Sequence, residues 1–354
     1  MNLHTQFANG GVQTIQTWFN STTALWDTTG WWNSANVLWT LLDYSARTKS
    51  NQYHEIATQV FEKHKSGNFL NNFYDDEGWW ALTWIKAYDV IGDEQYFAMA
   101  RTIFSDMTRG WDDHCGGGLW WNKDRKYKNA IANELFFSLA ASLSRHMTPT
   151  DEHGSYLDRG ERIFQQVAET LEHHETDQAS YLDWAKREWN WFSKSGMINS
   201  NHLINDGIND SCQNNGGTTW TYNQGVVLSG LVDMSALTKD SSYLQTAQTI
   251  ADATINTLVD SQGILHEPCE PNCGPDAPQF KGIFVRNLAV LADATHNDRY
   301  HQFIQKNADA IMQNNQTPPY HFGLTWSRPD TTFDAARQSS ALDAINVAMP
   351  LNPA

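Results

Sequence analysis

The segment WWNSANVLWTLLDYSARTKSNQYHEIATQVFEKH, residues 31–64, decides the fold. Its first half begins with an aromatic pair and carries apolar residues at helical spacing on nearly every face, which predicts a buried helix. Its second half follows a turn and has Ile56, Val60 and Phe61 on one face, which predicts a helix that is buried on one side only. The segment therefore predicts a pair of helices with different degrees of burial.

This helix pair recurs along the chain with a period of roughly 45–50 residues, longer in the middle. The first helices end in related triplets such as Leu42-Asp43-Tyr44 and Leu291-Ala292-Asp293. They are expected to start near Trp31, Asp76, Tyr127, Thr219, Phe280 and Gln338. Their partners are expected to start near Asn51, Glu94, Glu152, Ser241 and Asn297, with a helix over about His4–Phe19 as the sixth partner.

Six helices that are apolar all round and six that are one-faced are what a closed ring of helix pairs requires. The chain is therefore predicted to be all-α, an (α/α)6 toroid of six inner and six outer helices, in a single domain over residues 1–354. The stretch Tyr181–Lys194 contains three tryptophans and is interpreted as an extra helix inserted in the fourth pair.

The composition limits the possible partners. The chain has 40 acidic and 24 basic side chains and a formal net charge of −16, which excludes a general nucleic-acid or anionic-membrane binder. No apolar run of about 18 residues occurs, so no transmembrane segment is expected. Residues 1–10 lack the basic and apolar regions of a leader, so the chain is expected to be either cytoplasmic or a mature product without its signal.

The four cysteines lack the spacing of a zinc site, and neither a metal nor a cofactor is expected. Cys269 and Cys273 lie four residues apart in a proline-rich loop, where they either close a small disulfide or stay reduced. The disulfide would favour an oxidising compartment.

The toroid would bring a set of candidate binding residues together. Its inner helices all run in one direction, so the loops that precede them gather at one end of the ring, which we call its mouth. Several of the 16 tryptophans stand near these helix starts beside Asn, Gln or Asp, a combination that suits the apolar face and polar edge of a sugar. Any single tryptophan there is more simply a core residue, but the group favours a sugar site. The expected sugar-binding residues are Trp32, Asn33, Trp79, Trp80, Trp120, Asn129, Asp206, Tyr222, Gln224, Lys281 and Trp326.

Two adjacent carboxylates, Asp75 and Asp76, stand at the expected start of an inner helix beside Trp79 and Trp80. The helix N-terminus would keep one ionised, while burial and repulsion would raise the pKa of the other. One acid and one base or nucleophile are the requirement of glycoside hydrolysis, and adjacent side chains suit the short separation of a retaining enzyme. An ordinary helix start with an acidic first turn is the simpler alternative.

A rival acidic pair, Asp112-Asp113, precedes three glycines and is interpreted as a turn.

At these residues the sequence resembles glycoside hydrolase family 76, the endo-α-1,6-mannanases and their fungal cell-wall transglycosidase relatives. The resemblance is carried by Asp75-Asp76-x-x-Trp79-Trp80, Cys115–Trp121, Tyr127–Glu134, Thr219–Gly225 and Phe280–Arg286. It implies a retaining (α/α)6 enzyme with Asp75 as nucleophile and Asp76 as acid/base. It also implies cleavage within α-1,6-mannan backbones. It implies export as well, so a secreted, periplasmic or cell-surface protein is expected. The protein is expected to be a monomer.

Three alternatives stay open at this point. A transglycosidase acting on cell-wall or anchor glycans would use the same covalent intermediate with a sugar as acceptor. A non-catalytic mannan-binding protein would use the carboxylates only as hydroxyl ligands. A sugar epimerase would need histidine bases at the mouth, where His114 is the obvious candidate.

Overall fold

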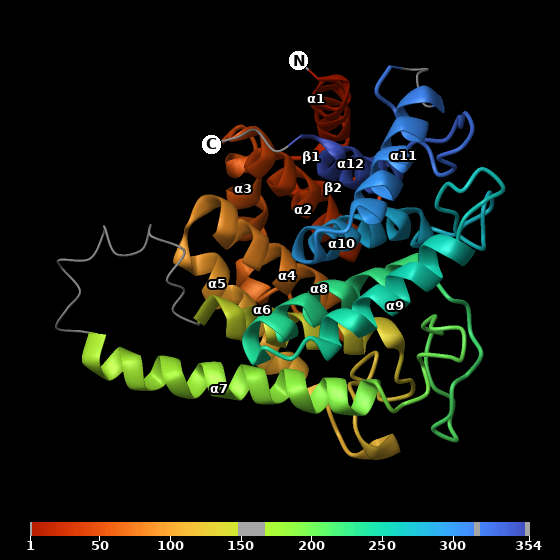
Figure 1. Cartoon of the computed structure of the whole chain (residues 1–354). Coiled ribbons are helices and arrows are strands. Elements are labelled where there is room, and N and C mark those ends of the chain that lie inside the picture. The colour runs from red at the N-terminus through yellow and green to blue at the C-terminus, as the bar shows by residue number, and fades with distance from the viewer. Residues whose placement is uncertain (1, 148–166, 315–318, 351–354) are drawn as a thin grey trace.

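Six helices form a closed ring in the computed structural model, which describes residues 2–147, 167–314 and 319–350 (Figure 1). Each of these inner helices packs against the next, and the last packs against the first. They are α2 (Trp31–Thr48), α4 (Tyr74–Ile91), α6 (Ala130–Met147), α8 (Thr221–Thr238), α10 (Phe280–Thr295) and α12 (Ala335–Ala348).

Six further helices in the described residues pack on the outside of this ring. They are α1 (Leu3–Gln16), α3 (His54–His64), α5 (Glu94–Met107), α7 (Val167–Phe192), α9 (Ser242–Thr257) and α11 (Asp298–Asn314). The (α/α)6 toroid predicted from the helix-pair repeat is therefore confirmed.

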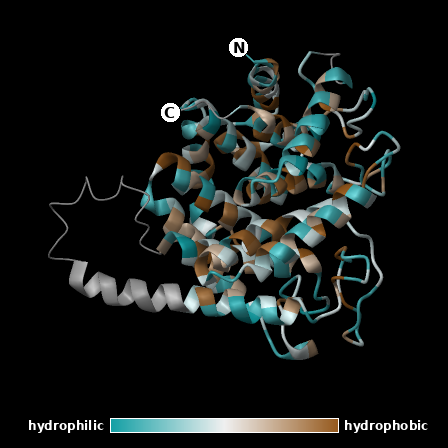
Figure 2. Cartoon of the chain, viewed as in Figure 1, coloured by the Kyte–Doolittle hydropathy of each residue, from teal (hydrophilic) through white to brown (hydrophobic). Residues whose placement is uncertain are grey.

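Burial of the two helix classes follows from their apolar patterns. The inner helix α6 is buried without interruption from Ala130 to Ser144. The outer helix α11 buries Tyr300, Ile304, Ala308 and Ile311, which lie three or four residues apart and form one stripe. Hydrophobic residues accordingly gather along the inner helices, whereas the peripheral loops are mostly hydrophilic (Figure 2).

One expectation about the helices was wrong. Tyr181–Lys194 is not an inserted helix, because Tyr181–Phe192 is the C-terminal part of the long outer helix α7, which packs on α6. The tryptophan-rich pattern suggested an extra element because α7 also covers the aromatic loop before α6, so that more than one of its faces is apolar. Trp184, for example, contacts both Trp111 and Phe136. The expected helix start near Glu152 lies outside the described residues.

Loops and short elements complete the chain. A two-residue hairpin, β1 (Phe19–Asn20) paired with β2 (Leu25–Trp26), precedes α2. Short 3-10 turns are η1 (Lys65–Gly67), η2 (Thr108–Gly110), η3 (His114–Gly116) and η5 (Ala277–Gln279). In the part of the chain that the structure describes, no helix has the length and apolarity needed to cross a membrane.

Two disulfides constrain the loops that precede α6, α8 and α10. Cys269–Cys273, one of the two outcomes left open by the sequence, closes a small loop before α10. Cys115–Cys212 was not foreseen and joins the loop before α6 to the loop before α8, across 97 residues of chain. The second disulfide therefore fixes two neighbouring loops at one end of the ring.

A buried ion pair links three inner helices. Arg286 of α10 donates to Asp343 of α12 at 3.2 Å and to Asn36 of α2 at 2.6 Å. The Arg286 guanidinium also lies 4.1 Å from the centre of the Trp39 ring. These contacts bridge α2, α10 and α12, the helices at which the ring closes.

Candidate active site

Asp75 and Asp76 lie in the first turn of α4, directly after its first residue, Tyr74. The loop before α6 runs beside this turn, since the Tyr74 amide donates to the Trp121 carbonyl at 2.9 Å and Phe73 bridges to Asn122. Both aspartates are half-buried. The unpaired amides of the helix N-terminus favour negative charge at this position.

Each aspartate accepts one hydrogen bond from a neighbouring side chain. The indole N–H of Trp121 donates to Asp75 Oδ2 at 3.0 Å, and the Asn71 amide donates to Asp76 Oδ2 at 2.6 Å. The other oxygen of Asp75, Oδ1, is buried and has no hydrogen-bond partner among the described residues. One carboxylate oxygen of the pair is therefore unengaged by protein groups, although buried acceptors usually have a partner.

Asp75 and Asp76 together hold a single proton near neutral pH. Burial, followed by the charge of Asp76, raises the pKa of Asp75 to about 8. Burial also raises the pKa of Asp76 to about 6, against the opposing effect of the hydrogen bond from Asn71. Between these two values one carboxyl is protonated and the other is ionised, although both pKa values are raised, whereas the sequence led us to expect a raised pKa for only one of the two.

A row of aromatic rings from four inner helices lies beside the pair. Trp32 of α2 stacks on Trp79 of α4 at 5.5 Å, and Trp79 lies parallel to Tyr222 of α8 at 6.4 Å. Tyr222 in turn stacks on Phe280 of α10 at 3.7 Å. Trp32 and Tyr222 are partly exposed, so this row offers aromatic surface to a ligand.

Three further acids face the same region. Asp276 accepts from the Trp32 indole at 2.9 Å, and its charge acts on Asp76. Asp206 accepts from the Tyr127 hydroxyl at 2.5 Å. Glu134 of α6 is buried with both carboxyl oxygens unpartnered in the described part of the chain, and burial and the Asp206 charge raise its pKa. We call the set Asp75, Asp76, Glu134, Asp206, Asp276, Trp32, Trp79, Trp121, Tyr127 and Tyr222 the mouth cluster.

Several expected sugar-binding residues meet in this cluster, namely Trp32, Trp79, Asp206 and Tyr222. Burial and the charges of Asp206 and Asp75 raise the pKa of Tyr222, which places its hydroxyl in the field of both acids. Asn33 follows Trp32 but is buried, with an unpartnered side-chain nitrogen among the described residues.

Three other expected residues have structural contacts instead. Trp80 is fully buried and packs on Trp31, Phe69 and Trp84, so it has no surface for a sugar. The Gln224 amide exchanges hydrogen bonds with the backbone of Ile204. Asn129 accepts from the Ala132 amide and caps the start of α6.

Lys281, Trp326 and Trp120 also lie outside the mouth cluster. The Lys281 ammonium is fully buried, bonds to Glu270 and the Leu324 carbonyl, and lies 4.6 Å from the Trp326 ring centre. The Trp120 indole donates to Asp112 at 2.7 Å. Lys281 and Trp326 are therefore packed in the interior, and Trp120 faces Asp112, because the sequence pattern does not distinguish the ligand-facing side of a loop or helix from its packed side.

The expected site residues do not include Asn71, which donates to Asp76, or four members of the mouth cluster: Trp121, Tyr127, Glu134 and Asp276. Trp121 illustrates the reason, because neighbouring residues in extended chain point to opposite sides, and Trp120 was chosen instead. Glu134 and Tyr127 stand in the segment Tyr127–Glu134, whose sequence carries no signal of which side chain faces the acids. Asp276 stands before an inner helix, as the other site residues do, and that position was the available signal.

The rival pair has no catalytic arrangement. Asp112 is bound by the buried Lys128 ammonium at 2.8 Å, and Asp113 is exposed. Nearby, ligand atoms of His114, Cys115 and Cys212 lie within 4.8 Å of one another, but both sulfurs are joined in the disulfide and provide no thiolate for a metal.

Comparisons with known proteins identify relatives of the chain. The sequence profile described as Glycosyl hydrolase family 76 matches residues 4–177 and 163–353. A putative mannan endo-1,6-alpha-mannosidase of Schizosaccharomyces pombe is 27% identical over 287 residues, covering 74% of this chain and 58% of that protein. The mannan endo-1,6-alpha-mannosidase DFG5 of Saccharomyces cerevisiae is 26% identical over 349 residues, covering 89% of this chain and 70% of that protein. The chain thus spans little more than half the length of the fission-yeast relative.

A solved structure has the same fold. It is an inactive variant of the α-1,6-mannanase GH76A of a Salegentibacter species, altered at two aspartates, in complex with α-1,6-mannotetrose. The TM-score is 0.80 at 20% sequence identity, and the match covers 98% of this chain and 99% of that chain.

Proposed function

Because the chain belongs to glycosyl hydrolase family 76, we propose that it is a retaining, endo-acting α-1,6-mannanase that uses Asp75 and Asp76. The observation that carries the proposal is the buried, unpartnered Oδ1 of Asp75 in a pair that holds one proton beside a row of aromatic rings. The names of the yeast relatives and the mannotetrose complex support the same linkage.

The roles follow the two-step chemistry of retaining enzymes. Asp75 Oδ1 attacks the anomeric carbon and forms a glycosyl ester, while Asp76 donates its proton to the departing glycosidic oxygen. Asp76 then removes a proton from water, which attacks the anomeric carbon and releases Asp75. The Trp121 hydrogen bond to Asp75 Oδ2 fixes the nucleophile and leaves Oδ1 directed to the sugar.

The order of these roles has a consequence for the proton. In the free enzyme the higher pKa belongs to Asp75, whereas a nucleophile must be ionised and the acid protonated. The proposed order therefore requires the proton to lie on Asp76 once the sugar is bound. If Asp75 were instead the acid and Asp76 the nucleophile, the proton would stay on Asp75. The order of the two roles is therefore tested separately.

The aromatic row is proposed to hold the mannan backbone. Mannose presents C–H faces that suit Trp32, Trp79 and Tyr222, and its hydroxyls suit the carboxylates of Asp206 and Asp276. The two disulfides support export of the protein, because disulfides persist in oxidising compartments.

Product analysis with the Asp75→Asn and Asp76→Asn variants tests the proposal. The wild type should cut α-1,6-mannan into shorter oligosaccharides of retained configuration, and each variant should lose at least about 10³-fold in kcat with its circular dichroism unchanged. Near-wild-type turnover by either variant would remove the proposal. Products longer than the substrate would indicate transglycosylation, and affinity without cleavage would indicate a binding protein.

Trapping decides the order of the two roles. A 2-deoxy-2-fluoro mannosyl substrate slows hydrolysis of the ester, so the labelled aspartate can be read by peptide mass spectrometry. We expect the label on Asp75. A label on Asp76 would reverse the roles without affecting the reaction class.

A further inference from the structure

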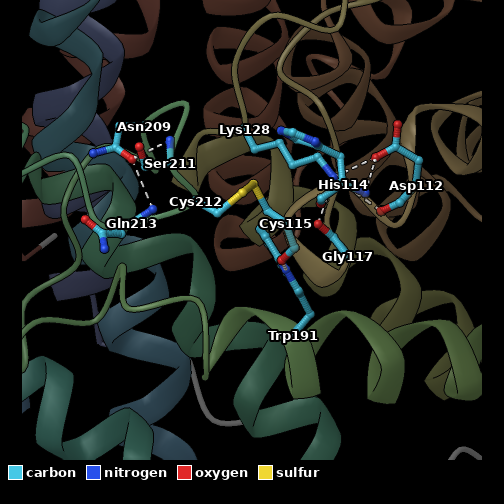
Figure 3. Close-up of a disulfide and its surroundings, with 10 residues drawn as sticks. All are labelled: Asp112, His114, Cys115, Gly117, Lys128, Trp191, Asn209, Ser211, Cys212 and Gln213. Atoms are coloured by element: carbon cyan, nitrogen blue, oxygen red, sulfur yellow. Dashed lines mark hydrogen bonds and ion pairs between the residues drawn. A yellow bond between two sulfur atoms is a disulfide. The ribbon is translucent and has the colours of Figure 1, made fainter.

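The disulfide Cys115–Cys212 joins two loops that together line a cavity of about 300 Å³. Trp120, Tyr127 and their neighbours form one wall, and Ile208, Asn209 and Asp210 form the other. Figure 3 shows the sulfur–sulfur bond between the loops, with His114 and Lys128 on one side and Asn209 on the other. This volume is at the lower end of sites that hold small molecules.

The cavity has more positive than negative groups, although the chain as a whole has a net charge of −16. Arg125, Lys126 and Lys128 line it, against the single carboxylate of Asp210. Lys128 is engaged, because its ammonium binds Asp112, the His114 carbonyl and the Gly117 carbonyl. Lys126 is exposed and makes no ion pair within the residues that the structure describes.

Arg125 keeps part of its charge available. Its guanidinium donates to the Arg109 carbonyl at 3.0 Å and lies 3.4 Å from Asp112, at the outer limit of a hydrogen bond, and about half of its side chain is exposed. Asp112 is already bound by Lys128 at 2.8 Å. Among the described residues that line the cavity, Lys126 is therefore the cation without an ion pair, and Arg125 is a second cation that is only loosely paired.

Aromatic surface accompanies these charges. Trp120 is itself buried beneath His114, which stacks on it at 5.1 Å, so the exposed His114 ring and the partly exposed Tyr127 ring are the ones that offer surface to the cavity. Flat rings beside charged and amide groups suit a sugar that carries a charge. A site for an inorganic anion alone would need no such rings.

The cavity adjoins the mouth cluster through a single layer of side chains. Tyr127 lines the cavity and donates to Asp206, and its ring lies 6.4 Å from Trp121. Trp121 binds Asp75. The mouth cluster contains five carboxyl groups and disfavours an anion, so an anionic group on the substrate is directed to the cavity instead.

A larger cavity, of about 510 Å³, also reaches the disulfide and is also lined by tryptophans and two cations, but both cations are engaged, since Lys194 donates to Asn190 at 2.6 Å. It is lined by Trp111, Trp191 and Arg187, and Arg187 already covers the Trp111 ring at 3.6 Å. Its lining includes no member of the mouth cluster.

We propose that the 300 Å³ cavity is a second sugar subsite, which binds a hexose bearing an anionic substituent, a phosphate or a carboxylate, attached as a branch to the mannan chain held at Asp75 and Asp76. Attachment of the acidic hexose to a mannan chain rests on the proposed function, whereas binding of the acidic hexose in the cavity does not. The enzyme would then prefer acidic, branched mannan to the neutral backbone.

Isothermal titration calorimetry of the full chain with three sugars tests the proposal without any turnover. Mannose 6-phosphate, glucuronic acid and mannose are titrated into the Asp75→Asn variant, so that the reaction plays no part. We expect at least one acidic sugar to bind tenfold or more tightly than mannose, with affinity that falls as salt is raised. The tighter of the two acids identifies the substituent as phosphate or carboxylate.

Matched charge substitutions locate the binding. Adding Lys126→Gln should weaken binding of the acidic sugar at least fivefold, whereas Lys186→Gln, an equal charge change on the exposed surface of α7, should leave it unchanged. The proposal is overturned if neither acidic sugar binds better than mannose, or if both lysine variants reduce binding equally. Absence of α-1,6-mannan cleavage by the wild type would instead count against the proposed function alone.

Discussion

Asp75 and Asp76 determine the pH range in which the proposed chemistry can run. Their pKa values, about 8 and about 6, leave one proton on the pair between those limits. Below about 6 both carboxyls are protonated and no nucleophile remains. Above about 8 both are ionised and no acid remains.

The first prediction is therefore a bell-shaped profile of kcat/KM against pH, with limbs near 6 and 8 and a maximum close to 7. Initial rates on α-1,6-mannotetraose between pH 4 and pH 10 measure it. A rate that stays level up to pH 10 would show that the acid is not a carboxyl of this pair.

The second prediction concerns the hydrogen bond from Trp121 to Asp75. Trp121→Phe keeps an aromatic ring but removes the donor that stabilises the ionised form of Asp75, so the pKa of Asp75 should rise further. We expect kcat to fall about tenfold and the basic limb to move to higher pH. Trp111→Phe, which removes an indole donor to Glu188 away from the mouth cluster, is the control and should keep both limbs. Equal effects of the two substitutions would indicate a general loss of packing.

At the scale of elements, the helix pairs could be predicted because their periodicity is local. The buried pattern of α2 and the single stripe of α11 are both readable from side-chain spacing. The direction of a side chain within a loop is set by tertiary contacts, which is why Trp120 was chosen over Trp121. The disulfide Cys115–Cys212 escaped prediction for the same reason, since it joins loops that are distant in sequence.

The third prediction compares the two disulfides. In the chain-entropy account, Cys115–Cys212 closes a loop of 97 residues and stabilises by about 4–5 kcal/mol, whereas Cys269–Cys273 closes a loop of four and stabilises by about 2 kcal/mol. The double variant Cys115→Ser/Cys212→Ser should thus lose about 2–3 kcal/mol more in free energy of unfolding than Cys269→Ser/Cys273→Ser. Urea titrations of both measure it. Equal losses would show that the long loop is already ordered in the unfolded chain.

The fourth prediction concerns Glu188, which is buried where α7 covers the loop before α6. Burial raises its pKa from 4.5 to about 8, although the Trp111 indole donates to it. As pH rises from about 4.5 to about 8, the unfolded chain loses this proton before the folded chain does. The stabilisation that Glu188 gives when protonated is therefore complete below its unfolded pKa and is lost as pH passes about 8.

The free energy of unfolding should accordingly fall as the pH is raised from 5 to 9, and Glu188→Gln should reduce that fall by on the order of 3 kcal/mol. Urea midpoints at several pH values give the slope. Glu55→Gln, at an exposed position of α3, should leave the slope unchanged. A wild-type slope retained in Glu188→Gln would mean that Glu188 is ionised in the folded protein.

For the molecule as a whole, closure of the ring was predictable from the count of helix pairs, but the contacts that close it were not. The last inner helix, α12, packs against the first, α2, although the chain between them spans nearly the whole sequence. A polar residue such as Arg286 gives no sequence signal of burial. It is tolerated because Asp343 and Asn36 supply the partners that a buried cation needs.

The fifth prediction tests this closure. Asp343→Asn removes the charge that compensates Arg286 and leaves a buried cation between α2, α10 and α12, so the free energy of unfolding should fall by about 3–5 kcal/mol. The double variant Arg286→Met/Asp343→Leu removes both charges and should recover most of that loss, because well-packed apolar side chains can replace a buried ion pair. The exposed pair Arg299–Asp252 is the comparison, and Arg299→Ala should cost less than about 1 kcal/mol. If the double variant is as unstable as Asp343→Asn, the ion pair is needed to hold α2, α10 and α12 in place, and removing both charges is not enough to restore stability. The interaction energy from the complete set of single and double variants distinguishes these two cases.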